Sequence, residues 1–153
     1  MLDAVMYAAL MELISLPLFG WLSDQIGRRP LYLLGALFTM LFAFPLFWML
    51  ESKSTALIFA AVMIAMNFGH GMMFAPESCY FPELFGPRVR YSGASFGFQV
   101  SAAIGGGFAP IIATALAGYL GGTNGVSIMM IVLALITLLA ALAARETKGG
   151  SLL

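Results

Sequence analysis

Two long apolar runs are joined by the stretch Gly20-Trp21-Leu22-Ser23-Asp24-Gln25-Ile26-Gly27-Arg28-Arg29-Pro30. A short charged stretch between two apolar runs of membrane length is typical of a tight hairpin at a membrane surface, and we expect the turn to occupy residues 20–30. Gly20 and Gly27 lack a side chain, so helices or turns can approach closely there. Asp24 is near enough in sequence for Arg28 to fold back onto it. The paired arginines predict that the hairpin faces the cytoplasm.

The composition excludes a water-soluble fold. Of the 153 residues, 61% are hydrophobic and 9% are charged, whereas soluble domains carry about 25% charged residues. We therefore expect an all-α integral membrane protein with the lipid bilayer as its surroundings. A net charge of zero gives no reason to expect nucleic acid. Cys79 is the single cysteine, and no cysteine and histidine cluster indicates a metal or another cofactor.

Five segments are long enough to cross the hydrocarbon layer, which takes about 20 apolar residues. They are residues 4–22, 31–50, 56–80, 92–120 and 126–144, followed by a short cytoplasmic tail over residues 145–153. The runs are continuous rather than alternating, which favours helices over barrel strands. A polar turn at residues 51–55 separates the second and third spans, and we expect a basic loop over residues 82–91 after the third. The glycine triplet at 105–107 predicts a close helix crossing or a bend within the fourth span.

The basic residues fall mainly on one side of these spans. Six of the seven follow the first, third or fifth span, and Lys53 alone follows the second. The six are Arg28, Arg29, Arg88, Arg90, Arg145 and Lys148. By the positive-inside rule this predicts an N-terminus outside the cell and a C-terminus in the cytoplasm.

The hairpin resembles the loop signature of the major facilitator superfamily, Gly-x-x-x-Asp-x-x-Gly-Arg-Arg. All five fixed positions match, at Gly20, Asp24, Gly27, Arg28 and Arg29. The alternative is a generic basic hairpin that serves only to orient its two spans. In the family, this signature lies between helices two and three and again between helices eight and nine.

Two later segments are similar to the metabolite:proton symporter branch of that superfamily. They are Glu-Leu-Phe-Gly-Pro-Arg-Val-Arg-Tyr-Ser-Gly at residues 83–93 and Gly-Gly-Gly-Phe-Ala-Pro-Ile-Ile-Ala-Thr at residues 105–114. Members of the branch carry shikimate, α-ketoglutarate, citrate, or proline and betaine. The ending Arg-Glu-Thr-Lys-Gly at residues 145–149 resembles the motif after the last helix of many superfamily members.

The resemblance implies a partial fold. It aligns the chain with helices eight to twelve of a twelve-helix carrier, a partial C-terminal half. The expected function is proton-coupled symport of a small organic acid or zwitterionic metabolite across the inner membrane, not enzymatic catalysis. The chain would be the C-terminal part of that carrier and inactive alone. Three alternatives stay open: a non-transporting truncated remnant, a sugar-porter-like or drug-efflux relative, and a partner for a separately encoded N-terminal part.

Ionisable and polar groups within spans are costly, so they are candidates for function. Glu12 and His70 are the proton-coupling candidates. Asn67, His70, Ser95 and Gln99 are the candidates for lining a substrate cavity, with Asn67 and His70 on one helix face. The competing interpretation for each is a hydrogen bond that only holds helices together. Glu77 is a third ionisable group within the spans, without an assigned role.

The remaining candidates come from the resemblance, which implies an inner charge network that closes the cytoplasmic side and breaks when the carrier opens inward. Together with the two glycines of the hairpin signature, the residues of this cytoplasmic motif and gate are Gly20, Asp24, Gly27, Arg28, Arg29, Glu83, Arg88, Arg90 and Glu146. For Arg145 and Lys148 we favour simple retention on the cytoplasmic side with solvated charges.

Overall fold

The computed structural model describes residues 2–148, and these fold into an all-helical bundle without a strand. The helices are α1 (Leu2–Ile26), α2 (Arg28–Glu51), α3 (Thr55–Ile64), the π-helix η1 (Ala65–His70), α4 (Gly71–Leu84), α5 (Arg90–Leu120) and α6 (Asn124–Ala143). Because α3, η1 and α4 run on without a break, they form one span, Thr55–Leu84. Five helices are therefore long and apolar enough to cross a membrane, which confirms the predicted fold class.

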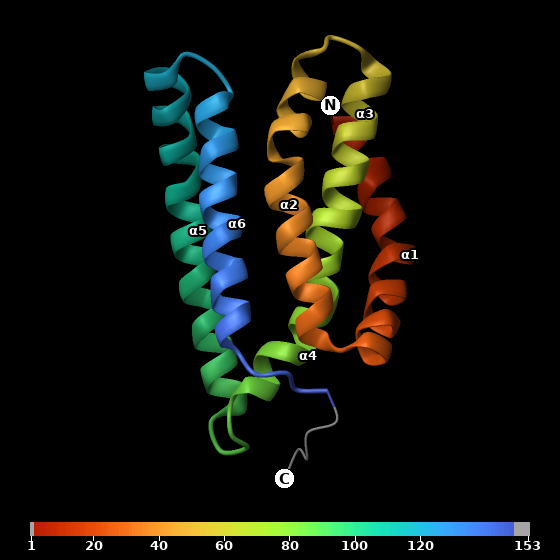
Figure 1. The fold of residues 1–153 in the computed structure, drawn as a ribbon, viewed down its shortest axis with the longest axis vertical. Coiled ribbons are helices and arrows are strands. Elements are labelled where there is room, and N and C mark those ends of the chain that lie inside the picture. Colours follow the sequence, from red (N-terminus) through yellow and green to blue (C-terminus); the bar gives the residue numbers. More distant parts are fainter. Residues whose placement is uncertain (1, 149–153) are drawn as a thin grey trace.

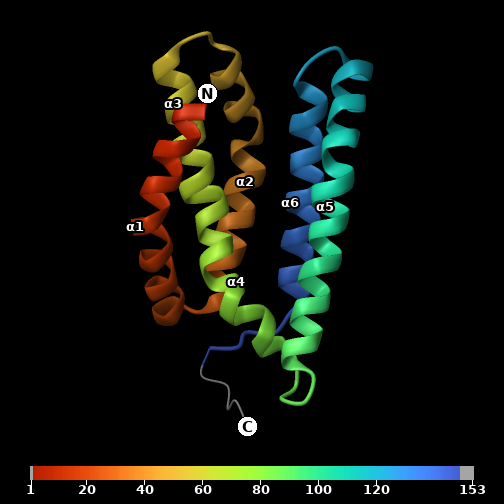
Figure 2. The same cartoon turned by 180° about the vertical axis from the view of Figure 1, so that it is seen from behind.

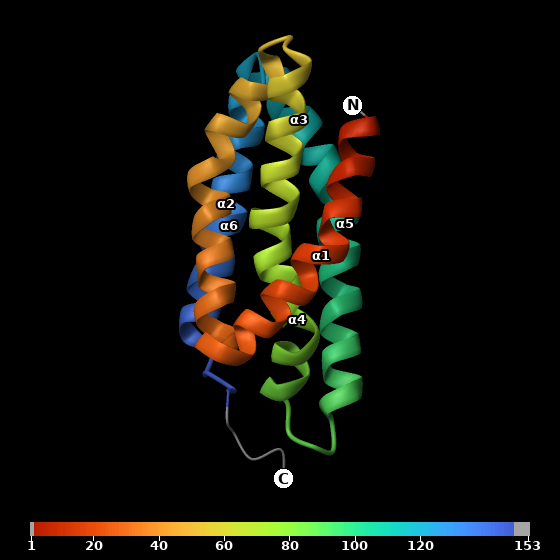
Figure 3. The ribbon, with the colours of Figure 1, turned by 90° about the vertical axis from the view of Figure 1, so that its right-hand side faces the viewer.

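The spans lie in two groups. Helix α1, α2 and the α3–α4 span pack together, and the α5–α6 hairpin stands beside them, joined to the rest mainly through α6 against α2 (Figures 1 and 2). Seen from the side, the α3–α4 span runs between α1 and α2 (Figure 3). Successive spans alternate in direction, so the described chain begins at one end of the bundle and reaches Lys148 at the other. We call that second end the tail end.

The hairpin turn is much shorter than predicted. Helix α1 continues to Ile26 and α2 begins at Arg28, so Gly27 alone makes the turn that we expected over residues 20–30. Gly27 has φ 112°, a conformation that residues with a side chain rarely adopt. A Cβ atom there would also lie 2.7 Å from a carboxylate oxygen of Glu146. Gly20, by contrast, has open space around it and supports no close approach.

Other helix ends also differ from the predicted spans. Helix α4 reaches Leu84 and α5 begins at Arg90, so the expected basic loop over residues 82–91 shrinks to residues 85–89. The physical reason is that hydropathy ends a span at its first polar residues, whereas charged residues extend a helix into the lipid headgroup layer. Of the predicted tail, residues 149–153 lie outside the described residues.

A π-helix interrupts the third span at Ala65–His70. A π-turn holds an extra residue compared with an α-turn, so it changes the direction in which later side chains point. The segment contains Asn67 and His70, two of the residues singled out from the sequence. Hydropathy and spacing carry no sign of it.

Small side chains dominate the buried core. Fully buried apolar positions include Ala4, Ala8, Ala36, Ala43 and Ala61, as expected where helices pack closely without a hydrophobic driving force in lipid. Helix α5 is the exception, because none of its residues is buried. Within residues 2–148, no other element approaches the glycine triplet at 105–107: α5 runs through it as a helix, and a Cβ atom added to any of the three glycines would meet nothing within 4 Å beyond the adjacent helix backbone.

Candidate functional site

The two proton-coupling candidates contact each other. The Nδ1 atom of His70, at the end of the π-helix, lies 2.9 Å from Oε1 of Glu12 on α1. The Glu12 side chain is 13% exposed and the His70 side chain 54% exposed, so the acid is the enclosed member of the pair. The ring of His70 also stacks on Phe74, with centroids 4.9 Å apart. A carboxyl and an imidazole in contact within a span can share or pass on a proton.

Asn67 lies on the same span and forms hydrogen bonds directly with α1. Its Oδ1 accepts a hydrogen bond of 2.7 Å from the Ser15 hydroxyl, and its Nδ2 donates to the carbonyls of Met63 and Ala8. The side chain is 1% exposed. Because the amide is used fully within the protein, its surroundings support the interhelical role for Asn67 rather than the substrate contact.

A cleft between α4 and α5 contains the other two cavity candidates. Ser95 and Gln99 on α5 line it together with Glu77 and Ser78 on α4. Its apolar walls are Phe74, Phe81, Pro82, Ala94 and Phe98, and its volume is about 290 Å³. Glu77 belongs to this group although its place in the sequence assigned it no role. The signal was present, since an acid within a span is a functional candidate by default.

The hairpin arginine Arg28 connects two acids at the tail end of the bundle. Its Nη1 lies 3.3 Å from Oδ1 of Asp24, one turn earlier, and its Nε lies 2.8 Å from Oε2 of Glu83 on α4. The Asp24 side chain is 65% exposed, whereas Arg28 and Glu83 are 16% and 14% exposed. Solvent therefore screens the Arg28–Glu83 pair less than the exposed Arg28–Asp24 pair. Through Arg28, the hairpin holds the end of the α4 helix.

Glu146 caps the N-terminus of α2 from the tail. Its two carboxylate oxygens accept hydrogen bonds of 3.1 Å from the backbone N–H groups of Arg28 and Arg29, and one of them also accepts 2.9 Å bonds from Thr147 and Lys148. Free N–H groups and the helix dipole both favour a negative charge at this position. Partial burial raises the pKa of the Glu146 carboxyl, but these four N–H donors outweigh it and hold the pKa below its ordinary value of 4.5.

Cationic side chains cap three helix C-termini at the same end. Arg29 donates to the carbonyls of Ala141 and Leu142 at the end of α6, and Lys148 donates to the Gln25 carbonyl at the end of α1. Arg145 lies 3.5 Å from the carbonyls of Glu83 and Leu84 at the end of α4. Cations at the negative ends of helix dipoles are favourable.

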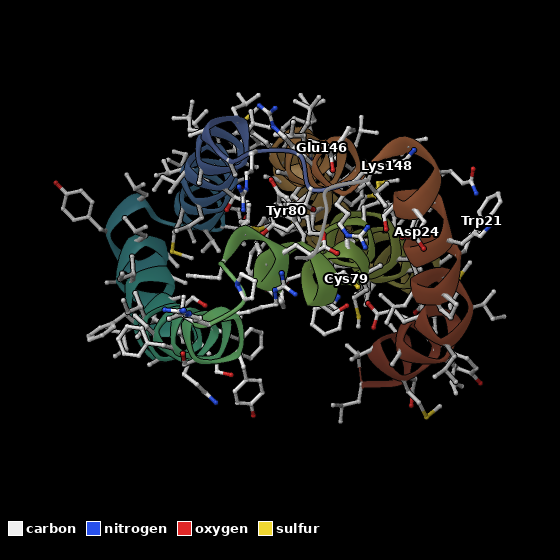
Figure 4. The ribbon with its side chains drawn as sticks, turned by 90° about the horizontal axis from the view of Figure 1, so that it is seen from below. Trp21, Asp24, Cys79, Tyr80, Glu146 and Lys148 are labelled. Atoms are coloured by element: carbon white, nitrogen blue, oxygen red, sulfur yellow. The ribbon has the colours of Figure 1, made fainter. Side chains whose placement is uncertain are left out.

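Arg145 and Lys148 are exposed, in agreement with solvated charges, and each also contacts a helix end. Figure 4 views this end of the bundle and shows Glu146 and Lys148 on the tail, close to the α1–α2 hairpin that carries Asp24. The Tyr80 hydroxyl adds a hydrogen bond of 3.2 Å to the Arg145 carbonyl. The tail is therefore held against the helix ends by these contacts.

Two predicted members of the inner network lie apart from these contacts. Arg88 is exposed in the turn between α4 and α5. Arg90 begins α5 and lines a second recess of about 470 Å³ with Pro82, Pro87, Tyr91, Ala94 and Ser95. Within residues 2–148, neither arginine forms an ion pair with an acidic side chain.

Comparison with known proteins decides the family. The model of the Major Facilitator Superfamily matches residues 2–151. This chain belongs to the major facilitator superfamily. It is 39% identical over 137 residues to the shikimate transporter of Escherichia coli K12, an alignment that covers 88% of this chain and 31% of that protein. It is also 33% identical to the citrate-proton symporter of Klebsiella pneumoniae over 69% of this chain and 24% of the relative.

A third relative is the proline/betaine transporter of Escherichia coli K12, 33% identical over 59% of this chain and 18% of that protein. These relatives confirm the metabolite:proton symporter branch. The chain spans about a third of the length of the first relatives that it matches. No solved structure matches it.

The Glu146 cap predicts an acid-sensitive stability. Because the pKa of Glu146 is lower in the folded chain than its ordinary 4.5, the stabilisation is complete above about pH 4.5 and disappears as the pH falls through the lowered pKa. We expect Glu146→Gln to lower the melting temperature at pH 7 and to reduce its further fall below pH 4.5, measured by circular dichroism in detergent.

The matched control is Asp3→Asn, an exposed acid near the start of α1 at the other end of the bundle. A melting curve for Glu146→Gln that follows the wild type at every pH would contradict the capping role.

Proposed function

We propose that this chain forms the C-terminal part of a proton-coupled symporter for a small organic acid or a zwitterionic metabolite. The observation that carries the proposal is the Glu12–His70 contact of 2.9 Å inside the spans, since it brings two proton-binding groups together where a charge is expensive. The names of the relatives support the substrate range, because they include a shikimate transporter, a citrate-proton symporter and a proline/betaine transporter.

The need for further helices is part of the proposal. The relatives are about three times as long as this chain, and α5 has no buried residue, so an apolar helix of 31 residues has little packing within the described bundle. Carrier sites typically form between repeated halves that move against each other. We therefore propose that a preceding set of helices, in the same polypeptide or encoded separately, completes the transport path.

The orientation and the roles of individual residues follow from the same proposal. Six of the seven basic residues lie at the tail end of the bundle, so we assign this end to the cytoplasmic side. We place the protein in the inner membrane of the cell. Ser95 and Gln99 contact substrate in the α4–α5 cleft, while Glu12 and His70 exchange the coupled proton. Asp24, Arg28 and Glu83 act as a latch that closes the cytoplasmic side.

Uptake by cells tests the proposal directly. We would express the chain alone and joined to the coding region that precedes it, and measure uptake of radiolabelled shikimate, α-ketoglutarate, citrate and proline. We expect uptake by the extended form only. Uptake by the short form would contradict the requirement for further helices, and no uptake by either form would favour a non-transporting membrane protein.

The coupling role of Glu12 has its own test in the extended form. An amide cannot take up a proton, so Glu12→Gln should abolish proton-driven accumulation while exchange of internal for external substrate continues in part. Glu12→Asp keeps a titratable group and serves as the control. Unchanged accumulation in Glu12→Gln would remove Glu12 from the coupling role.

The latch is tested by Asp24→Asn. The exposed Asp24–Arg28 pair contributes at most about 1 kcal/mol to stability, so membrane insertion should stay normal. Transport should nevertheless fall several-fold, because the closed cytoplasmic side loses one of its charge pairs. Normal flux with normal insertion would mean that this aspartate only marks the topology of the hairpin.

A further inference from the structure

We infer that the α4–α5 cleft binds a metabolite carrying both a positively charged nitrogen and a carboxylate, so that the substrate is a zwitterion rather than a purely anionic acid. The inference rests on the proposed function and narrows its substrate class. Three features support the inference: the acid Glu77 in the cleft, the aromatic side chains beside it, and Arg90 in the adjoining recess.

Glu77 is the acid of the cleft and has no basic neighbour there. The side chains that line the cleft with it are aromatic, apolar or neutral polar. Within residues 2–148, no lysine, arginine or histidine nitrogen lies within 4.0 Å of its carboxylate. The charge of His70 acts on Glu77 from farther away, but without an ion-pair partner a carboxylate is still costly at membrane depth. A ligand with a positively charged nitrogen would offset that cost, whereas a purely anionic ligand would increase it.

The walls of the cleft suit the same kind of group. Phe74, Phe81 and Phe98 all line it, from both helices. The face of an aromatic ring attracts an ammonium group, and the attraction grows when water is excluded. Ser78, Ser95 and Gln99 add hydrogen-bonding groups. The volume of about 290 Å³ suits a small metabolite.

Arg90 supplies the complementary charge. The recess that it lines shares Pro82, Ala94 and Ser95 with the cleft, so the two spaces adjoin along the same faces of α4 and α5. The Nε atom of Arg90 is buried and has no hydrogen-bond partner among the described residues. Since Arg90 lines the recess, its guanidinium group can offer a charge-assisted hydrogen bond to a ligand carboxylate there. Glu77 and Arg90 thus place opposite charges in two adjoining spaces.

The cleft also adjoins the proton-coupling pair. Phe74 lines the cleft and stacks on His70, which in turn contacts Glu12. A ligand bound beside Glu77 is thus separated from the Glu12–His70 pair by a single aromatic side chain. Substrate and proton sites would therefore lie close together along one helix.

The test compares a zwitterion with an anion in the extended carrier. Uptake of radiolabelled proline and shikimate would be measured for the wild type, Glu77→Gln and the matched control Asp3→Asn, with the amount of each variant in the membrane determined by immunoblotting. We expect the KM for proline to rise about tenfold in Glu77→Gln, because a charge-assisted contact is lost. Shikimate uptake should stay the same or improve, and Asp3→Asn should behave as the wild type.

A wild-type carrier that takes up shikimate but not proline, or a Glu77→Gln variant with an unchanged KM for proline, would overturn this inference and leave the carrier function standing. The absence of uptake of every substrate by the extended wild type would instead contradict the proposed function itself, and the inference with it. If Glu77→Gln does not reach the membrane, Phe98→Leu decides the question. Removing that ring should raise the KM for proline about threefold and leave shikimate unaffected.

Discussion

The arrangement of the spans depends on side chains that cap the helix termini at the tail end of the bundle. Each helix end there has backbone groups without an intrahelical partner, and side chains or water must satisfy them. Glu146 accepts hydrogen bonds from the backbone N–H groups at the start of α2. The carbonyls at the ends of α6, α1 and α4 are contacted by Arg29, Lys148 and Arg145, respectively. Four spans are thereby tied together by side chains from the start of α2 and a short tail.

The proton coupling that we propose would require a contact that can change toward the middle of the bundle, and the π-helix Ala65–His70 places a carboxyl–imidazole contact there. The segment brings two polar residues against α1 in different ways. Asn67 is buried and fully bonded, so it fixes the distance between the helices, whereas His70 is half exposed and contacts an acid that can change its charge. The Asn67–Ser15 contact and the His70–Glu12 contact thus lie within one turn of the same span. In the proposed mechanism, a change of protonation would act on the His70–Glu12 contact while Asn67 keeps the two helices packed together.

The sequence was sufficient for the fold class, because apolar runs of membrane length and one-sided basic residues follow from the bilayer itself. The Asp24–Arg28 contact was also predictable, since the two residues are one turn apart. The contacts of Glu146 with Arg28 and of Glu12 with His70 join residues 118 and 58 positions apart, and spacing alone cannot indicate such partners. The π-helix and the grouping of Glu77 with Ser95 and Gln99 depend on local backbone geometry and on how α4 and α5 pack, neither of which leaves a periodic signal.

The cap on α2 also sets an order of events during synthesis. Arg28 leaves the ribosome 118 residues before Glu146, so the α1–α2 hairpin is inserted long before its own cap exists. At ordinary rates of translation that delay lasts several seconds or more. During this interval the start of α2 and the end of α1 remain open to the headgroup region or to insertion factors. This end of the bundle therefore closes only after residues 145–148 have been translated.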